Sequence, residues 1–162
     1  MVRVGVVSDT HLREYDEAFA RRLAQALGEV DLVLHAGDLV SLVVLDMLPG
    51  EQVYAVAGNM DLPPVQAQLP AKRVVEIAGR RIGLIHGWGA PIGLARRVKA
   101  EFEGENVECI VFGHSHRPMN EVVDGVVMFN PGSAAKGWLG SGSVGVLEVD
   151  EGGIRGRILK LP

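Results

Sequence analysis

The sequence predicts an α/β fold in which two mixed β-sheets pack together and are flanked by helices. Short apolar runs recur along the chain; amphipathic stretches alternate with them in the first third, and tight turns separate several of them in the second half. Alternating strands and helices are typical of parallel sheets, whereas tight turns join antiparallel strands. Because 162 residues fit one domain, we expect residues 1–162 to form a single unit.

The first third of the chain alternates strand and helix. Between its first two apolar runs, hydrophobic residues recur at every fourth position and predict a helix over Asp16–Gly28, with Asp16 as the N-cap and Gly28 as the stop. Ser41 can cap a shorter helix that reaches Leu48. The apolar runs predict three buried strands at Val2–Val7, Leu32–His35 and Val53–Val56.

The second half contains hairpin signals. A helix is expected over Pro91–Phe102 and a buried strand over Glu108–Phe112. We therefore expect the first half of the fold to be parallel and the second half antiparallel. The predicted hairpins pair Arg73–Ile77 with Arg81–Ile85, Val122–Val123 with Val126–Phe129, and Val144–Val149 with Ile154–Leu159.

Composition excludes several classes of protein. Hydrophobic residues make up 48% of the chain and charged residues 22%, which rules out a disordered protein. The net charge of -4 and the lack of a basic block argue against general nucleic-acid binding. Cys109 is the only cysteine, so no intrachain disulfide forms. No apolar run approaches the ~20 residues of a membrane span, and the amino terminus enters a strand at once, so we expect a soluble cytoplasmic protein without a signal peptide.

Polar side chains follow the apolar runs in five short motifs: S-D-T-H, H-A-G-D, G-N-M-D, I-H-G and F-G-H-S-H. Because sites in open α/β sheets lie at the carboxyl ends of strands, we expect these side chains to converge. Imidazole, carboxylate and amide oxygen together form a ligand set for divalent metals. Seven such groups exceed the needs of one ion and indicate a two-metal hydrolytic centre; they are Asp9, His11, Asp38, Asn59, His86, His114 and His116.

Each motif taken alone also fits an ordinary structural role. Gly-Asn at Asn59 is common in left-handed turns, and His86 could simply end a strand. Asp61 is either a hydrogen-bond acceptor behind the ligands or a turn cap. His35 lies within a strand, so we expect it to pack or to support the ligands without binding metal. The joint occurrence of seven candidate ligands at the ends of five strands favours the metal centre.

The order and spacing of these motifs resemble the calcineurin-like metallophosphoesterase superfamily, in particular its small uncapped bacterial and archaeal phosphodiesterases; N-P-G-S at Asn130–Ser133 adds to the likeness. The resemblance implies a four-layer sandwich and a dinuclear phosphoric diester hydrolase in which Asp38 bridges the ions and acts with Asn59 and His86 in catalysis. Manganese is the expected metal, with nickel, iron, zinc, cobalt and magnesium as alternatives. The implied ligands are Asp9, His11, Asp38 and His116 for the first ion, and Asp38, Asn59, His86 and His114 for the second.

The resemblance further implies that a hydroxide held between the metals attacks a small phosphodiester. Met60 stands where many family members carry a histidine, which favours diesters over alkyl monoesters. Arg13 and Arg117 either grip substrate phosphate or are solvated, and Trp88 either forms a lip or packs. The alternatives are a scaffold like the retromer subunit that shares this fold, a nuclease, or a phosphomonoesterase. The sequence does not decide the role of Trp138 or the oligomeric state, for which a homo-oligomer is one option.

Overall fold

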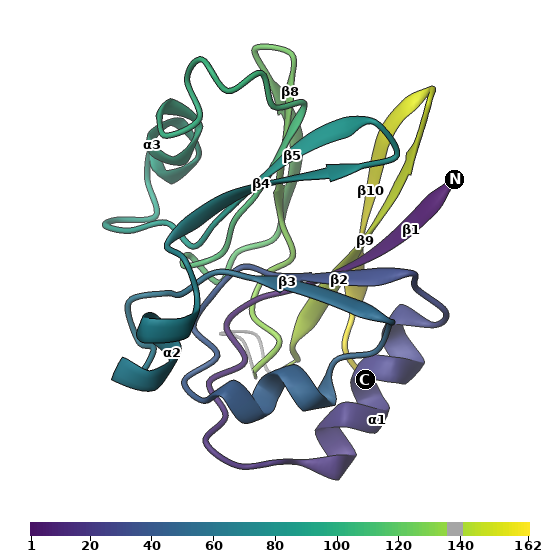
Figure 1. Ribbon diagram of the computed structural model, residues 1–162, viewed down its shortest axis with the longest axis vertical. Helices are drawn as coiled ribbons and strands as arrows, with labels where there is room; N and C mark the ends of the chain where they lie inside the picture. Colours follow the sequence, from purple (N-terminus) through teal and green to yellow (C-terminus); the bar gives the residue numbers. More distant parts are fainter. Residues whose placement is uncertain (136–140) are drawn as a thin grey trace.

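The computed structural model describes residues 1–135 and 141–162, so Trp138 lies outside the described part. Within that part, ten strands form two five-stranded sheets that face one another (Figure 1). The first sheet has the order β10 (Gly153–Lys160), β9 (Ser143–Asp150), β1 (Val2–Val7), β2 (Leu32–His35) and β3 (Gln52–Ala55). The second has the order β4 (Lys72–Ile77), β5 (Arg80–Ile85), β6 (Cys109–Val111), β8 (Val126–Asn130) and β7 (Met119–Val123).

Both sheets are mixed, which confirms the predicted fold class but not the expected division into halves. In the first sheet β1, β2 and β3 are parallel, and β9 runs antiparallel to β1. In the second, β5, β6 and β8 are parallel, so the expectation of an antiparallel second half was wrong. Hairpin turns determine only how consecutive strands pair. The long connection through α3 (Leu94–Ala100) carries the chain across the sheet and allows β5 and β6 to run parallel.

The main core lies between the sheets, and helices cover the two outer faces. Alternation along β1 directs Val4 and Val6 into the core between the sheets, whereas Val7 packs with α1 (Glu17–Leu27) and the 3-10 helix η1 (Leu42–Met47). On the second sheet, Val98 of α3 packs against the outward-facing residues. Figure 1 shows α1 and α3 at opposite ends of this four-layer sandwich. No helix within residues 1–135 and 141–162 is long and apolar enough to cross a bilayer.

The helix boundaries follow local chemistry. Asp16 caps α1 as predicted, because its Oδ1 accepts the Phe19 N–H at 2.9 Å, and Gly28 ends the helix with φ 64°. The segment capped by Ser41 is a 3-10 helix. The helix α2 (Pro63–Gln68) was not predicted, because six residues are too few for an apolar stripe to recur.

Candidate metal centre

Five loops meet at the carboxyl ends of β1, β2, β3, β5 and β6, as their positions after the strands predicted. Backbone hydrogen bonds align loops that are far apart in sequence: the Asp9 N–H donates to Gly37 O at 3.0 Å, and the Gly113 N–H donates to His86 O at 3.0 Å. The His11 N–H donates to Asp38 O at 3.1 Å and extends the first of these contacts. The site is therefore built on backbone pairing that continues beyond the ends of the strands.

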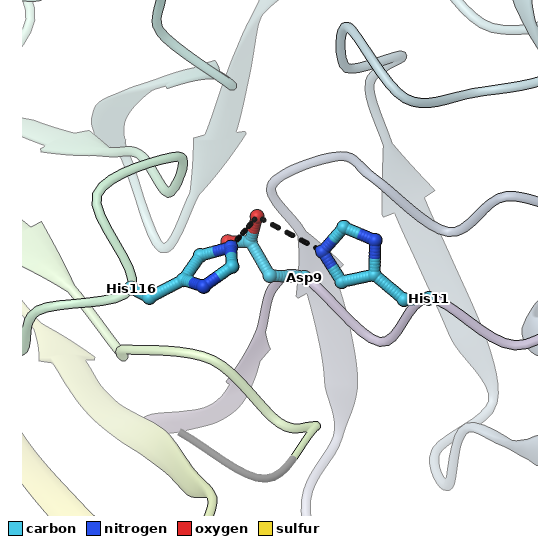
Figure 2. A group of neighbouring side chains, drawn as sticks. All are labelled: Asp9, His11 and His116. Atoms are coloured by element: carbon cyan, nitrogen blue, oxygen red, sulfur yellow. Dashed lines mark hydrogen bonds and ion pairs between the residues drawn. The ribbon is translucent and has the colours of Figure 1, made fainter. Parts of the chain in front are cut away.

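Asp9 lies at the centre of this cluster and is fully buried. Its Oδ1 is 3.1 Å from His116 Nε2 and 3.7 Å from His11 Nε2, and Figure 2 shows the carboxylate between the two rings. The other oxygen, Oδ2, accepts the Ser8 hydroxyl at 2.6 Å and the His114 N–H at 3.2 Å. Oδ2 is thus held by hydrogen-bond donors of the protein, while Oδ1 faces imidazoles.

Asp38 is the second buried carboxylate of the site. Its Oδ2 lies 3.2 Å from His86 Nε2 and 3.9 Å from His11 Nε2, while Oδ1 accepts the Met60 N–H at 2.8 Å. Asp38 therefore faces one histidine from each predicted ligand set. Asp9 does so as well, because its Oδ1 is 3.9 Å from His86 Nε2.

The histidines on the other side of the site meet Asn59. The Oδ1 of Asn59 is 3.1 Å from His86 Nε2 and 3.2 Å from His114 Nδ1. The remaining nitrogen of each ring meets a backbone carbonyl: His86 Nδ1 is 2.7 Å from Ala36 O, and His114 Nε2 is 2.8 Å from Gly89 O. In the neutral rings, a proton on those nitrogens donates to the carbonyls and leaves the lone pairs of His86 Nε2 and His114 Nδ1 directed into the site, which is the form that metal ligands require.

The backbone adopts an unusual conformation at five of the seven predicted ligands. Non-glycine residues rarely have positive φ, and such residues concentrate at functional sites. The hydrogen bonds between the loops hold the backbone in this geometry. The φ angles are 55° at Asp9, 51° at His11, 57° at Asp38, 68° at His114 and 58° at His116.

Two glycines of the motifs allow the loops to approach closely. A Cβ on Gly58 would collide with the carboxylate of Asp38. Gly37 has φ 95°, and a Cβ there would lie 2.8 Å from His86 Nδ1. The glycines of G-D and G-N-M-D therefore stand where the backbone of one loop touches the ligand side chains of another.

The two carboxylates hold their charge despite burial. Burial by itself raises the pKa of Asp9, but interactions with His11 and His116 outweigh it and hold this pKa far below its usual range. Burial likewise opposes the charge of Asp38, whose pKa is lowered by the hydrogen bond with His86. The same pair raises the pKa of His86 against the effect of its burial. The pKa of His116 is raised chiefly by its hydrogen bond to Asp9. The site thus concentrates negative charge that cations can neutralise.

The residues present fit divalent metal ions. His11 Nε2 is buried and has no hydrogen-bond partner among the described residues, although it lies 3.7 Å from Asp9 Oδ1 and 3.9 Å from Asp38 Oδ2. Those separations are too long for hydrogen bonds, but two ligands that each lie about 2.0–2.2 Å from one ion are roughly 3 Å or more apart. Two triplets have ligand atoms within 4.8 Å of one another, namely Asp9 with His11 and His116, and Asp9 with Asp38 and His86.

Asp61 connects the Asp38 loop to the Asn59 loop. Its Oδ1 accepts the Val40 N–H at 2.6 Å, and its Oδ2 accepts the N–H groups of Gly58 at 2.6 Å and Asp38 at 3.1 Å. This buried carboxylate accepts only backbone N–H groups in these contacts. It supports the loops that carry two candidate ligands, which is the supporting position that the sequence offered as one alternative.

Three further buried polar residues support the site from behind. The Asn130 side chain donates to Gly113 O at 2.9 Å, and the Ser133 hydroxyl donates to Asp9 O at 3.0 Å. His35 accepts the Gly37 N–H on Nδ1 at 3.1 Å, and its Nε2 lies 3.2 Å from the Thr10 hydroxyl. Asn130 and Ser133 were noted only for the likeness of their motif. The signal for their role is a pair of polar residues at the carboxyl end of a strand, one on either side of Pro131-Gly132.

The remaining residues named from the sequence lie at the margin. Arg117 is exposed and lines a hollow beside His116. Arg13 is exposed on the loop before α1. A contact of either arginine with substrate stays a prediction. Met60 is 57% exposed, and Trp88 is 44% exposed. Trp88 lines a smaller hollow together with Asn59.

A metallohydrolase is the class of protein that this fold and this donor set define. A family model of the calcineurin-like phosphoesterase superfamily domain matches residues 2–152, and the chain belongs to that superfamily, as a metallophosphoesterase. It is 34% identical over 148 residues to a probable metallophosphoesterase of Methanothermobacter thermautotrophicus, covering 91% of this chain and 86% of that protein.

Two other similarities bear on function and fold. A phosphodiesterase of Methanocaldococcus jannaschii is 25% identical over 168 residues, covering 93% of this chain and 95% of the relative. The crystal structure of Vps29 from Entamoeba histolytica in complex with zinc has a TM-score of 0.72 at 23% identity and covers 99% of both chains. At that identity the second likeness concerns the fold alone.

Proposed function

We propose that the chain is a metal-dependent phosphodiesterase that hydrolyses a small phosphodiester at a two-metal centre. The observation that carries this proposal is the convergence of the candidate ligands around two buried carboxylates, with His11 Nε2 left without a hydrogen-bond partner among the described residues. The likeness to a phosphodiesterase of Methanocaldococcus jannaschii over nearly the whole chain supports the choice of a diester.

The first ion would be held by Asp9, His11, Asp38 and His116, and the second by Asp38, Asn59, His86 and His114. Mixed nitrogen and oxygen ligands suit manganese, although zinc is the first alternative to test because a Vps29 of the same fold has been solved with it. Asp38 is the proposed bridge because the family resemblance assigns it that position, and the 3.9 Å and 3.2 Å distances from its Oδ2 to His11 Nε2 and His86 Nε2 support the choice.

Divalent ions bound here would lower the pKa of water and neutralise charge on the phosphoryl oxygens. The chain holds the ligands so that they need not reorganise. The carbonyls of Ala36 and Gly89 orient the imidazoles of His86 and His114, and the Met60 N–H holds Asp38. Asp38, Asn59 and His86 are the proposed catalytic residues because Asn59 Oδ1 and Asp38 Oδ2 lie 3.1 Å and 3.2 Å from the same atom, His86 Nε2.

The preference for diesters rests on position 60. The side chain of Met60 is exposed at the site and has no proton to give to a departing alkoxide. Substrates with good leaving groups need no such proton, and general acid catalysis is worth about 10²- to 10⁴-fold where it operates. The sequence also allows a scaffold role. A scaffold does not need paired buried carboxylates and oriented imidazoles, so these features favour the enzyme.

The test is hydrolysis of bis(p-nitrophenyl) phosphate by protein stripped of metal and then supplied with manganese or zinc, with bound metal counted on the same sample. We expect inactive metal-free protein, restored activity, and two ions per chain. Asp38→Asn should remain folded and inactive, whereas Asp46→Asn, an exposed aspartate on η1, should match the unmodified protein. A folded, metal-loaded protein without activity on diesters would overturn the proposal and favour the scaffold.

A further inference from the structure

A hollow of ≈ 620 Å³ opens beside His116. Its volume lies within the range of about 300–1,000 Å³ that small-molecule sites occupy. Because His116 is a candidate ligand, one arm of a phosphodiester bound at the centre can enter this space. Its polar lining includes Ser115, His116, Arg117, Ser133, Ser143 and Lys160.

Two cations line the hollow without partners of opposite charge. The other basic residues on β10 are paired, Arg155 with Asp150 at 2.7 Å and Arg157 with Glu148 at 3.4 Å. No described carboxylate forms an ion pair with Lys160 or with Arg117, so within residues 1–135 and 141–162 both charges remain uncompensated. In a chain of net charge -4, this places positive charge beside the candidate centre.

Two serine hydroxyls of the hollow already donate to backbone carbonyls. Ser133 donates to Asp9 O at 3.0 Å, and Ser143 donates to Pro131 O at 2.6 Å. Arg117 and Lys160 are the charged groups of the lining, apart from His116, that can recognise an anionic ligand. Pro118 and Ile158 add apolar surface against which the body of a ligand can pack.

We propose that this hollow is a subsite for one arm of the substrate, and that this arm carries a second anionic group, a phosphate or a carboxylate, bound by Arg117 and Lys160. The proposal rests on the proposed diesterase function and names its substrate class. Arg117 supplies a planar fork that matches either anion, and Lys160 supplies a point charge.

Three p-nitrophenyl diesters test the proposal; their second arm is 3-hydroxypropyl, 3-phosphopropyl or 3-carboxypropyl. We expect kcat/KM to be about fivefold higher for at least one of the anionic arms than for the hydroxyl arm, the size expected of two exposed ion pairs. The arm that gains more identifies the anion. In the double variant Arg117→Gln/Lys160→Gln the ratio should fall toward one, while Arg155→Gln should keep it. A ratio near one in the unmodified protein, or a ratio that the double variant retains, would overturn the subsite.

A binding experiment distinguishes failure of the subsite proposal from failure of the proposed diesterase function. If all three diesters are inert in metal-loaded protein, the diesterase proposal fails, and NMR titration with 3-hydroxypropyl phosphate and 4-hydroxybutyrate then decides whether the subsite exists. Saturable shifts at Arg117 and Lys160 that the double variant loses support the anion site. Their absence refutes it.

Arg97, on α3, organises the loop that follows β5. Its Nη1 donates to Ile92 O at 3.0 Å, and its Nη2 donates to Trp88 O at 2.9 Å and to Ala90 O. One guanidinium thus binds three carbonyls of a five-residue segment. The same segment supplies Gly89 O, which lies 2.8 Å from His114 Nε2.

We infer that Arg97 is a positioning residue for His114. By holding the loop it keeps Gly89 O where it accepts the Nε2 proton, and this leaves the lone pair of His114 Nδ1 directed at the ligand side, 3.2 Å from Asn59 Oδ1. Partners behind a metal-binding histidine typically change metal affinity by about 10- to 100-fold.

The tautomer of His114, measured by NMR of imidazole nitrogens in the metal-free protein, tests this role without relying on catalysis. We expect the Nε2–H tautomer of His114 to dominate in the unmodified protein, and the Nδ1–H tautomer to become populated in Arg97→Met. In that variant the affinity for one of the two manganese ions should also fall at least ~10-fold. Arg97→Lys keeps the charge without the fork and should give a smaller shift in the same direction, and it replaces the Met variant if that variant does not fold. Arg96→Met, an exposed neighbour, is the control. An unchanged tautomer in folded Arg97 variants would refute the role.

Discussion

The candidate centre has a buried floor and an exposed rim, and the two are built differently. Asp9, Asp38 and His86 form the floor and are 0%, 2% and 3% exposed. On the rim, Met60 is 57% and Trp88 44% exposed. The floor residues lie within three residues of the ends of β1, β2 and β5, and hydrogen bonds between their loops continue the pairing of the strands. The rim side chains are partly open to solvent, so burial does not require each of them to have a partner.

This difference separates two tasks. Buried charges need partners, so each floor carboxylate is held by imidazoles and by donors from neighbouring loops. Such a floor suits the binding of cations, a task that depends on close control of distance. Under the proposed function, the exposed rim would contact the groups attached to phosphorus. Changes on the floor should therefore abolish a reaction, and changes on the rim should alter the choice of substrate.

Asp9→Asn should have the largest effect, because Asp9 Oδ1 faces His11, His86 and His116 at once. The amide keeps the shape but loses the charge that neutralises a cation. We expect diester hydrolysis to fall more than the ~10- to 100-fold typical of losing a partner behind a ligand. Manganese binding measured by calorimetry should weaken in parallel. Asp46→Asn is the matched control, and unaltered metal binding in Asp9→Asn would show that the floor is not the metal site.

The floor could be predicted from sequence, and its supports could not. Asp9, Asp38 and His86 each follow an apolar run, so the rule that sites lie at strand ends was sufficient to group them. Ser133 binds the backbone of a loop 124 residues away, and Asn130 binds that of the loop after β6; no local pattern encodes such contacts. His35 is a case between these: its place inside a strand indicated a supporting role, but not its bond to Gly37.

The fold shows the same limit. Apolar runs and turn residues located most strands, since these signals are local. The pairing of β9 with β1 joins the two ends of the chain, and neither run specifies its partner. The expected antiparallel second half failed for this reason, as hairpins reveal only neighbours in sequence.

Asp61→Asn should give the largest loss of stability, because one carboxylate accepts three backbone N–H groups. An amide keeps only one acceptor oxygen and turns its own N–H groups toward donors. We expect the free energy of unfolding to fall by about 2–4 kcal/mol in urea titrations of the metal-free protein. Asp46→Asn should change it by less than ~0.5 kcal/mol. A loss that small in Asp61→Asn would mean that the two loops are held together by other contacts.

His35 should make the stability depend on pH. Burial lowers its pKa to about 3, whereas the unfolded side chain titrates near 6.5. Between these values the unfolded chain binds a proton that the folded chain does not, so this residue makes stability fall as pH falls, by about 1.4 kcal/mol per pH unit. Urea unfolding at pH 7, 6 and 5 should give a shallower pH slope for His35→Gln than for the unmodified metal-free protein. Equal slopes would contradict a neutral buried His35.

Met60→His should have the smallest effect and should act on substrate choice alone. Its backbone N–H already holds Asp38, so the new side chain changes the rim without moving the floor. An imidazolium can protonate a departing alkoxide, but an exposed ring that is not held in place should supply only a fewfold gain out of the ~10²–10⁴ that general acids reach.

The gain should appear with alkyl leaving groups and not with p-nitrophenolate, which departs without a proton. It requires the protonated ring, so it should be present below pH ~6.5 and disappear as pH rises through that value. The measurement is the ratio of the hydrolysis rates of alkyl and p-nitrophenyl diesters across pH ~5.5–8, which covers about one pH unit or more on either side of the imidazole pKa. Met60→Gln is the control for the size and polarity of the new side chain. An equal gain in the Gln variant, or one without pH dependence, would show that the rim changes leaving-group selectivity by shape and not by proton transfer.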